Sequence, residues 1–256
     1  MERGEAIELT VGGEAVRGVY HAAADASAPA VVFAHGFGST RVGEKAEALA
    51  AECAARGWGF AAGDFRGHGA SGGTILGLRG SRLLEDLDAL AVWVAARHAG
   101  PLCLCGSSMG GWAAAWFAAR GRVPVAACAF VAPAFHFLEQ RRLTPEEREA
   151  WRRTGRHRVR NEWVDVEIGW GLAAEAGQFP ADALAAQLQT PFILFHGMRD
   201  EVVPYAESLE FAASAAAPEV EVVLIGDGDH RLSREKGRIA RAACDFFAGR
   251  AGLKPN

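Results

Sequence analysis

The chain has 256 residues, half of them apolar and 23% charged, with a formal net charge of −4. This length suits one sizeable α/β domain, alone or with an insertion, better than two independent domains, and the composition is not that of a disordered chain. The small negative charge gives no reason to expect nucleic acid or an anionic membrane as a partner, and no apolar run approaches the roughly 20 residues that span a bilayer.

The N-terminal residues and the cysteines bear on the compartment. No apolar segment follows the charges of the first 18 residues, so we expect no signal peptide. The chain has five cysteines, and Cys103 and Cys105 alternate within an apolar run that predicts a buried strand. Buried free thiols in a reducing compartment are the simplest account of this odd number. We therefore expect a cytoplasmic protein, while its oligomeric state is left open.

In chain order, the predicted elements begin with a hairpin and continue as alternating strands and helices. Residues 6–20 alternate apolar and polar around "VGG", which indicates two antiparallel strands. The later apolar runs do not alternate, and helical stretches separate them, which is typical of a parallel sheet buried on both faces. The expected strands are 30–35, 59–64, 101–106, 125–132, 191–197 and 220–227, and the clearest helices are 43–57, 83–100, 205–217 and 237–250.

One segment, 136–189, interrupts this alternation of strands and helices. It contains no strong strand run, and we expect it to form helices and a small hairpin within 159–169 that lie over the strand ends. The predicted organisation is therefore a core domain of residues 1–135 and 190–256, with a cap or lid inserted at 136–189.

Polar residues stand where several of the apolar runs end. They are His35, Asp64, Ser108, Asp200 and His230. In an open parallel sheet, ligands bind beyond the carboxyl ends of the strands. We therefore expect the functional site at this edge.

The stretch 106–110, "GSSMG", matches G-x-S-x-G with Ser108 at its centre. A strand precedes it and a helix follows directly, so the turn would expose the hydroxyl at a helix N-terminus that favours a developing anion. The alternative is a glycine-rich corner with an incidental serine. A phosphate-binding loop does not fit, because neither G-x-x-x-x-G-K-[ST] nor G-x-G-x-x-G occurs near the glycines of "FAHGFGS".

A serine nucleophile needs a base, and the base needs an orienting carboxylate. His230 follows the last apolar run, and Asp200 follows the preceding strand by a short loop. Asp227 and Asp229 are alternative carboxylates, but a group so close to His230 on one strand end would point elsewhere or crowd the imidazole. We therefore favour Asp200.

The oxyanion of an acyl-transfer reaction needs two N–H donors. The amide of Met109, directly after the candidate nucleophile, is one. The amide of Phe37 in "FAHGFGS" is the other, because Gly36 and Gly38 allow the chain to approach closely.

Four stretches together resemble the α/β-hydrolase family over nearly the whole chain: "FAHGFGS", "DFRGHGASGG", "GSSMGGW" and "PFILFHGMRDEVVP" with "GDGDH". The stretch "GSSMGGW" followed by "VAPAF" is most similar to small acyl-ester and acyl-thioester hydrolases. The resemblance implies an α/β fold with a mostly parallel eight-stranded sheet, helices on both faces and a small helical cap. It also implies Ser108 as nucleophile, His230 as general base and Asp200 as orienting acid, with Phe37 and Met109 as oxyanion amides and with no metal or cofactor.

Within "DFRGHGAS", the resemblance implies that Asp64, Arg66 and His68 form a structural loop near the site; catalysis by His68 is the alternative. Aspartate at the position of Ser108 would have suggested a dehalogenase or an epoxide hydrolase, and serine argues against both.

The cap and the residue directly before it carry candidate substrate-binding aromatics. Each of them could merely anchor the cap to the core, but together we expect them to form part of an apolar acyl or aryl pocket. These residues are Phe135, Phe137, Trp151, Trp163 and Trp170.

Residues 141–160 contain eight arginines and three glutamates. Such a run is usually a solvated helix face with i, i+4 pairs. The alternative is attraction of an acidic substrate, such as a glucuronide or an acyl-carrier thioester.

The sequence thus predicts a serine hydrolase that cleaves a small-molecule carboxylic ester or thioester through an acyl-enzyme. A peptidase or a carbon–carbon bond hydrolase would use the same three residues, because the pocket selects the leaving group. A binding protein that keeps the fold without catalysis is the alternative from a different class.

Overall fold

The computed structural model describes residues 4–160 and 163–252. An eight-stranded sheet forms its centre, in the order β1-β2-β4-β3-β5-β6-β9-β10. Only β2 pairs antiparallel, with both β1 and β4, whereas the pairs from β4 to β10 are parallel. The strands are β1 Glu5–Val11, β2 Glu14–His21, β3 Ala30–Ala34, β4 Gly59–Gly63, β5 Leu102–Ser107, β6 Ala127–Val131, β9 Phe192–Gly197 and β10 Val220–Ile225.

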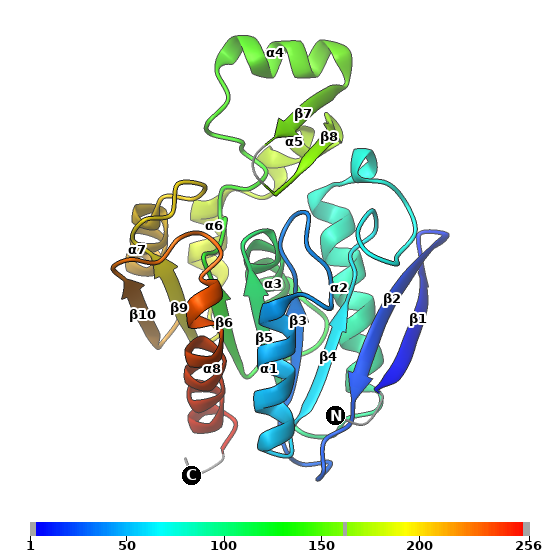
Figure 1. Ribbon diagram of the computed structural model, residues 1–256, viewed down its shortest axis with the longest axis vertical. Helices are drawn as coiled ribbons and strands as arrows, with labels where there is room; N and C mark the ends of the chain where they lie inside the picture. The colour runs from blue at the N-terminus through cyan, green and yellow to red at the C-terminus, as the bar shows by residue number, and fades with distance from the viewer. Residues whose placement is uncertain (1–3, 161–162, 253–256) are drawn as a thin grey trace.

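Helices cover both faces of this sheet (Figure 1). On one face, α1 and α8 pack against each other and against one apolar cluster; on the other, α2, α3, α6 and α7 pack against a second cluster. The two clusters take alternate residues of each strand, as in Val31 against Val32, because successive side chains of a strand point to opposite faces. The helices are α1 Glu44–Ala55, α2 Gly80–Ala95, α3 Met109–Arg120, α6 Ala181–Gln187, α7 Tyr205–Ser214 and α8 Lys236–Arg250.

This architecture confirms the predicted α/β-hydrolase fold class. The hairpin, the six later strands and the four helices form where the periodicity predicts them. All five cysteines are buried and free, as the pattern around Cys103 and Cys105 indicates.

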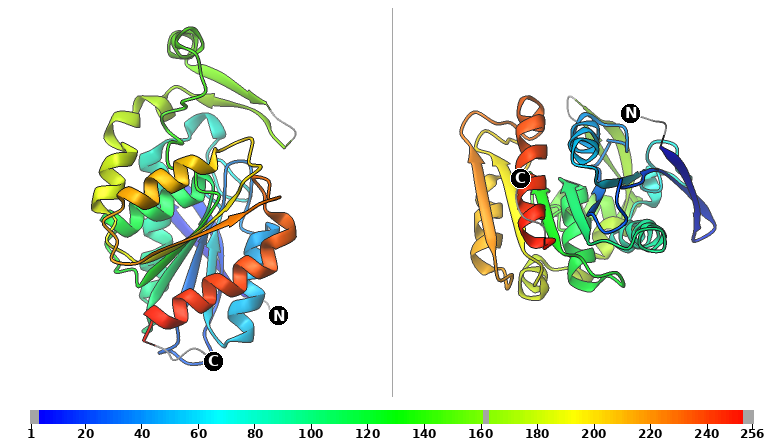
Figure 2. Two further views of the ribbon diagram at one scale, coloured as in Figure 1. Left: turned by 90° about the vertical axis from the view of Figure 1, so that its left-hand side faces the viewer. Right: turned by 90° about the horizontal axis from the view of Figure 1, so that it is seen from below.

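Between β6 and β9 the chain leaves the sheet and forms a projecting unit over one end of the strands (Figure 1; Figure 2, left). A capping box at Thr144 starts its first helix, and Gly155, with φ 73°, ends it and turns the chain into a two-stranded antiparallel sheet. Its remaining segments return along α6 to the core. The elements are α4 Pro145–Thr154, β7 Arg156–Arg160, β8 Asp165–Gly169, α5 Gly171–Ala174 and the 3₁₀ turn η2 Ala176–Gln178.

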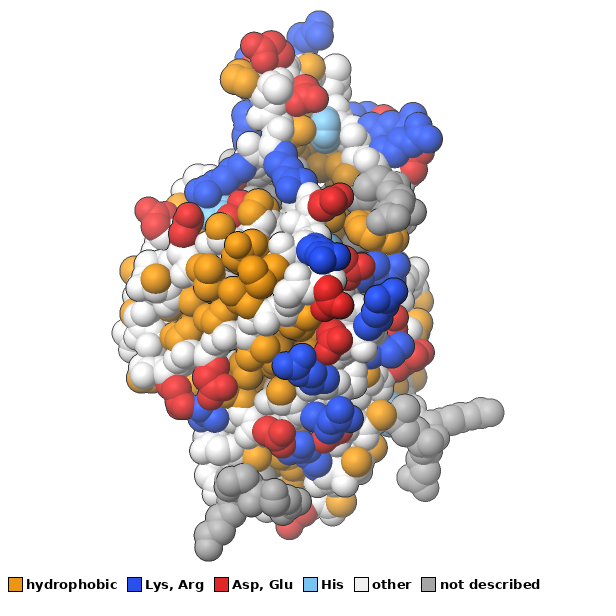
Figure 3. All heavy atoms as spheres, turned by 60° about the vertical axis from the view of Figure 1, so that its left-hand side comes forward, with side chains coloured by type: hydrophobic (Ala, Val, Ile, Leu, Met, Phe, Trp, Pro, Cys, Tyr) orange, Lys and Arg blue, Asp and Glu red, His pale blue; other side chains and the backbone are white. Residues whose placement is uncertain are grey.

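These elements include helices and a hairpin, as expected, but the hairpin begins at Arg156, before the expected range 159–169, of which residues 161–162 lie outside the described residues. We keep the name cap for residues 136–189. Its standing as a separate domain stays a prediction. Lys and Arg side chains gather on it in the space-filling view (Figure 3).

Candidate active site

Ser108 lies at the corner between β5 and α3, with φ 52° and ψ −117°. A non-glycine residue rarely adopts such a backbone, and the tightness of the corner imposes it. A Cβ at Gly106 would collide with the backbone of Gly110, and a Cβ at Gly110 would collide with the end of β3. The flanking glycines therefore allow the turn that holds the Ser108 side chain out from the strand end.

Three side chains from separate loops meet at this corner. The Oγ of Ser108 lies 3.1 Å from Nε2 of His230, and Nδ1 of His230 lies 2.6 Å from Oδ2 of Asp200. These residues follow β5, β10 and β9, which end at the same edge of the sheet. The imidazole therefore bridges hydroxyl and carboxylate, with Nδ1–H donating to Asp200 and Nε2 left to accept from the serine hydroxyl.

The Asp200 side chain is fully buried, and its hydrogen bonds keep it ionised. Burial alone would raise its pKa, but hydrogen bonds from His196, His230 and the Val203 amide outweigh burial and hold the pKa well below its ordinary value. The amides of Val202 and Val203 both donate to Oδ1 at 2.8 Å. A fixed negative charge thus lies behind the imidazole.

The alternative carboxylates take other roles. Oδ1 of Asp229 accepts a hydrogen bond from the Leu232 amide at 2.8 Å, and the residue is exposed. Asp227 is also exposed. Neither replaces Asp200 at the His230 ring in this structure.

The loop after β3 brings Phe37 beside this corner. A Cβ at Gly36 would lie only 3.4 Å from the Cβ of Ser108, so the two backbones are in near contact. The Gly36 carbonyl accepts hydrogen bonds from Nδ1–H of His35 at 2.8 Å and from the Ser39 amide at 3.1 Å. In a trans peptide the N–H points away from the carbonyl, so these bonds fix the direction of the Phe37 amide.

The tautomer of His35 follows from its second contact. The Phe65 amide donates to Nε2 of His35 at 3.1 Å, so the proton of the neutral ring is on Nδ1. Burial lowers the pKa of His35, which keeps the ring neutral. The other candidate amide, that of Met109, begins α3, where an N–H has no partner within the helix.

The "DFRGHGAS" loop has structural contacts, as the resemblance implies. Asp64 accepts hydrogen bonds from the amides of Arg41 and Ala70 and pairs with the Arg41 guanidinium. Arg66 is 5% exposed and bonds Asp86. His68 is buried with its ring 5.9 Å from that of Phe37 and is not hydrogen-bonded to the three residues at the corner.

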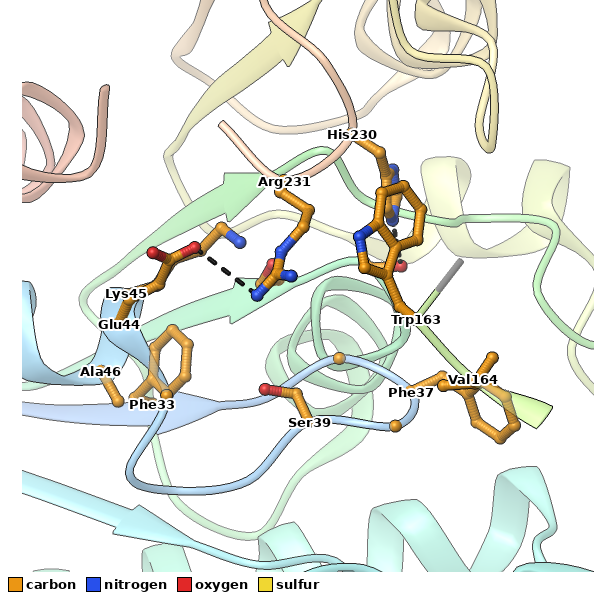
Figure 4. A pocket seen from close by; sticks show the side chains of 15 residues that line it. Phe33, Phe37, Ser39, Glu44, Lys45, Ala46, Trp163, Val164, His230 and Arg231 are labelled. Atoms are coloured by element: carbon orange, nitrogen blue, oxygen red, sulfur yellow. Dashed lines mark hydrogen bonds and ion pairs between the residues drawn. The ribbon is translucent and has the colours of Figure 1, made fainter. Parts of the chain in front are cut away.

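Two cavities meet at Ser108 and share Phe37, Trp163, Val164 and His230 in their walls. One has about 300 Å³, lies under the cap and is lined mainly by apolar side chains; we call it the apolar cavity. The other has about 250 Å³ and extends toward the start of α1; we call it the polar cavity (Figure 4). The apolar cavity is lined further by Ala134, Phe137, Leu143, Val159, Ile168, Val202, Val203 and Pro204, with His136, Gln140, Arg141, Arg142 and Glu207.

The five aromatics expected in a substrate pocket divide into two groups. Phe137 and Trp163 line the apolar cavity, and the Phe137 ring lies 6.1 Å from that of Phe37. Phe135, Trp151 and Trp170 line neither cavity. Phe135 is buried and stacks on Phe211 of α7 at 3.6 Å, which favours the anchoring role for this residue. Trp151 packs edge-on against Trp170 within the cap.

The cap arginines are mostly paired at the surface. Arg152 bonds Glu149, Arg156 bonds Glu167, and Arg158 bonds Asp165, all with exposed side chains. This pairing favours a solvated face for these three. Attraction of an acidic substrate by the cap stays a prediction.

Two features of the site were not found from the sequence. His196, near the end of β9, has Nε2 3.0 Å from Oδ2 of Asp200, and its Nδ1 lies 2.7 Å from Oγ of Ser208. Lys45 and Arg231, which line the polar cavity, were not singled out because each stands in an ordinary polar context. A basic residue directly after His230 was the one available signal for Arg231.

Two kinds of feature, a cluster of metal-ligating side chains and a membrane-spanning helix, are absent from the described ranges 4–160 and 163–252. Within them, no group of three or more His, Cys, Asp or Glu side chains could hold a metal ion. Nor is any helix there long and apolar enough to cross a bilayer. The expected cytoplasmic location stays a prediction.

Comparison with known proteins identifies the family of the chain. A family model described as serine aminopeptidase, S33 (Hydrolase_4) matches residues 25–170. The chain belongs to this α/β-hydrolase family. It is an enzyme, a hydrolase of the esterase and thioesterase class.

Individual relatives of this hydrolase span most of its length. The mitochondrial palmitoyl-protein thioesterase ABHD10 of Mus musculus is 30% identical over 224 residues, which are 84% of this chain and 73% of the relative. The crystal structure of a putative hydrolase from Agrobacterium vitis S4 has a TM-score of 0.85 at 29% identity and covers 95% of this chain and 99% of its own. The structure of α/β hydrolase domain-containing protein 10 from mouse has a TM-score of 0.79 at 25% identity, covering 94% and 96%.

Proposed function

We propose that this hydrolase cleaves carboxylic esters or thioesters through a covalent acyl-enzyme on Ser108. The observation that supports this most is the continuous hydrogen-bond chain from the Ser108 hydroxyl through His230 to Asp200, at 3.1 and 2.6 Å. A positioned imidazole can accept the hydroxyl proton, and the carboxylate stabilises the imidazolium that forms.

In the first half-reaction, Oγ of Ser108 attacks the acyl carbonyl carbon while Nε2 of His230 takes the hydroxyl proton. The carbonyl oxygen becomes an oxyanion, held by the amides of Phe37 and Met109. When the intermediate collapses, the bond to the leaving alkoxide or thiolate breaks, and the proton on Nε2 passes to it. The alcohol or thiol departs, and the acyl group stays as an ester of Ser108.

In the second half-reaction, a water molecule gives a proton to Nε2 of His230 and attacks the acyl-enzyme. Collapse of this intermediate returns the proton to Oγ of Ser108 and releases the carboxylic acid. Asp200 keeps its charge throughout and holds the Nδ1–H tautomer. No step calls for a group outside this chain and its substrates.

We infer that the apolar cavity takes the acyl group. Phe137, Leu143 and Ile168 in its wall would remove an acyl chain from water. The relatives named as palmitoyl-protein thioesterases point in the same direction, toward an apolar acyl group and a thioester. The leaving group then lies on the other side of Ser108.

The test is a panel of p-nitrophenyl acetate, p-nitrophenyl octanoate and octanoyl thioester, assayed with the chain and with Ser108→Ala. We expect turnover of the esters or the thioester, and labelling of Ser108 by a fluorophosphonate. Loss of both in Ser108→Ala, with an unchanged circular dichroism spectrum, is the supporting result. Full labelling of Ser108→Ala would refute the assignment of the nucleophile.

A peptidase is the second candidate, because the matching family is described as a serine aminopeptidase. Leucine p-nitroanilide belongs in the panel for this reason. Faster turnover of the anilide than of the octanoate ester would favour it over the esterase. Absence of turnover for every substrate would favour a binding protein, and a carbon–carbon bond hydrolase would require an assay with a β-diketone.

A further inference from the structure

The wall of the polar cavity carries charged side chains next to the proposed nucleophile. Lys45 and Arg231 line it together with Glu44 and Ser39, while Ser108 and His230 form its inner end. Figure 4 shows Lys45, Glu44 and Arg231 close together on the side of the cavity away from Phe37 and Val164. The cavity is therefore polar on the side toward the start of α1.

Positive charge is in excess at this wall. Glu44 is already engaged: its carboxylate accepts a hydrogen bond from the Ser233 hydroxyl and lies 3.7 Å from Arg231 and 3.6 Å from Lys236. Asp229 contributes a weaker attraction to Lys45 from a distance and is itself exposed. Glu44 and Asp229 thus face three cations, two of which line the cavity.

Lys45 is the cation without a partner. Among residues 4–160 and 163–252, no ion pair or hydrogen bond involves its ammonium, although the residue is partly buried. Burial lowers its pKa, and the charge of Glu44 only partly opposes this. A partly desolvated ammonium without a hydrogen-bonded anion is unfavourable, so binding an anion there would be stabilising.

We propose that the polar cavity binds an anionic group, a carboxylate or a phosphate, on the leaving group of the substrate, with Lys45 as the main cation and Arg231 as the second. This inference rests on the proposed function, since the two cavities meet at Ser108 and an acyl chain in the apolar cavity directs the leaving group into the polar one. The hydroxyl of Ser39, in the same wall, is a further donor.

The probes are two octanoyl esters with leaving groups of the same shape, 3-hydroxybenzoate and 3-hydroxybenzamide. They differ in charge, and comparing the ratio of kcat/KM between protein variants cancels their intrinsic reactivity. We expect Lys45→Met to lower the carboxylate-to-amide ratio about tenfold, the size of one charge-assisted hydrogen bond in a partly buried site. Lys45→Arg should restore part of it.

Arg238→Gln is the matched control, since Arg238 is exposed on α8 and lines neither cavity. It should leave the ratio unchanged. Raising the ionic strength from 0.05 to 0.5 M should lower the wild-type ratio, because salt screens an attraction between charges. An equal loss for both esters in Lys45→Met would show a structural role and overturn the proposal.

Two further substrates test which anionic group binds and on which side of the ester bond it lies. The octanoyl ester of 3-hydroxyphenyl phosphate distinguishes phosphate from carboxylate, and a p-nitrophenyl monoester of sebacic acid carries its charge at the far end of the acyl chain. A Lys45-dependent preference for the sebacate ester in place of the hydroxybenzoate ester would refute the assignment to the leaving group.

A binding measurement separates this inference from the proposed function. Calorimetric titration of the chain with 3-hydroxybenzoate and 3-hydroxybenzamide needs no turnover. Tighter binding of the carboxylate that is lost in Lys45→Met would support the anion site even if no ester were hydrolysed. Equal affinities, with both esters hydrolysed at a ratio insensitive to Lys45, would overturn the inference and leave the proposed function standing.

Discussion

His68 makes the stability of this hydrolase depend on pH. Its ring is 5% exposed, and burial, followed by the nearby His35, lowers the pKa of His68 from 6.5 to about 4. The unfolded chain therefore binds a proton at pH values where the folded chain does not. The stabilisation is fully present above pH 6.5 and is lost as the pH falls toward 4. Since one pKa unit corresponds to 1.36 kcal/mol, the loss attributable to His68 is about 3 kcal/mol.

The assay is urea unfolding followed by tryptophan fluorescence at pH 7, 6, 5 and 4, for the wild type and His68→Leu. Other groups also titrate in this range, so the difference between the two proteins isolates the histidine. We expect the free energy of unfolding of His68→Leu to change less steeply with pH than that of the wild type. The difference in slope should correspond to at most one proton per molecule. Identical pH profiles would mean that the folded protein protonates His68 as readily as the unfolded chain does, and would refute the reasoning.

Three further predictions concern catalysis. Asp200→Asn should lower kcat/KM for p-nitrophenyl octanoate about 10³–10⁴-fold, because the imidazole loses the charge that fixes its tautomer. The circular dichroism spectrum should be unchanged, and a loss below tenfold would contradict this prediction. His35→Phe should lower kcat about 10–100-fold, because the Gly36 carbonyl loses the His35 hydrogen bond that fixes the direction of the Gly36–Phe37 peptide, while fluorophosphonate still labels Ser108. Leu143→Trp should shift the preferred acyl chain to a shorter length in a series of p-nitrophenyl esters, where each buried methylene otherwise raises kcat/KM about fourfold.

The sheet and the meeting of Ser108, Asp200 and His230 followed from sequence because they depend on local signals. Apolar runs without alternation specify strands buried on both faces, and parallel strands end at one edge. Glycines on both sides of Ser108 indicate a corner whatever packs around it. The positions of the three side chains are therefore fixed by where strands stop.

The cap was less predictable, because side chain orientation there depends on tertiary packing. Phe135 and Phe137 are two residues apart, yet the first stacks on Phe211 of α7 and the second lines the apolar cavity. Trp151 and Trp163 divide in the same way, with Trp151 buried in the cap. Composition identified an aromatic-rich segment but could not say which rings face the substrate.

His196 illustrates a different limit. Its Nε2–H donates to the Val203 carbonyl at 3.0 Å, a contact with the loop that follows β9. Its second contact, with Asp200, depends on Ser208 of α7, whose hydroxyl orients the ring from the far side. Such a relay joins a strand, a loop and a helix, and no local pattern encodes it.

The backbone at Ser108 has a consequence for how the enzyme could lose activity. With φ 52° and ψ −117°, this residue is held in a conformation that glycine adopts freely, at an energetic disadvantage of about 1–3 kcal/mol. Ser108→Gly would thus release conformational tension while deleting the hydroxyl. The backbone at position 108 would therefore be less strained in an inactive Ser108→Gly variant than in the active enzyme. The nucleophile is held in place at a cost in folding free energy.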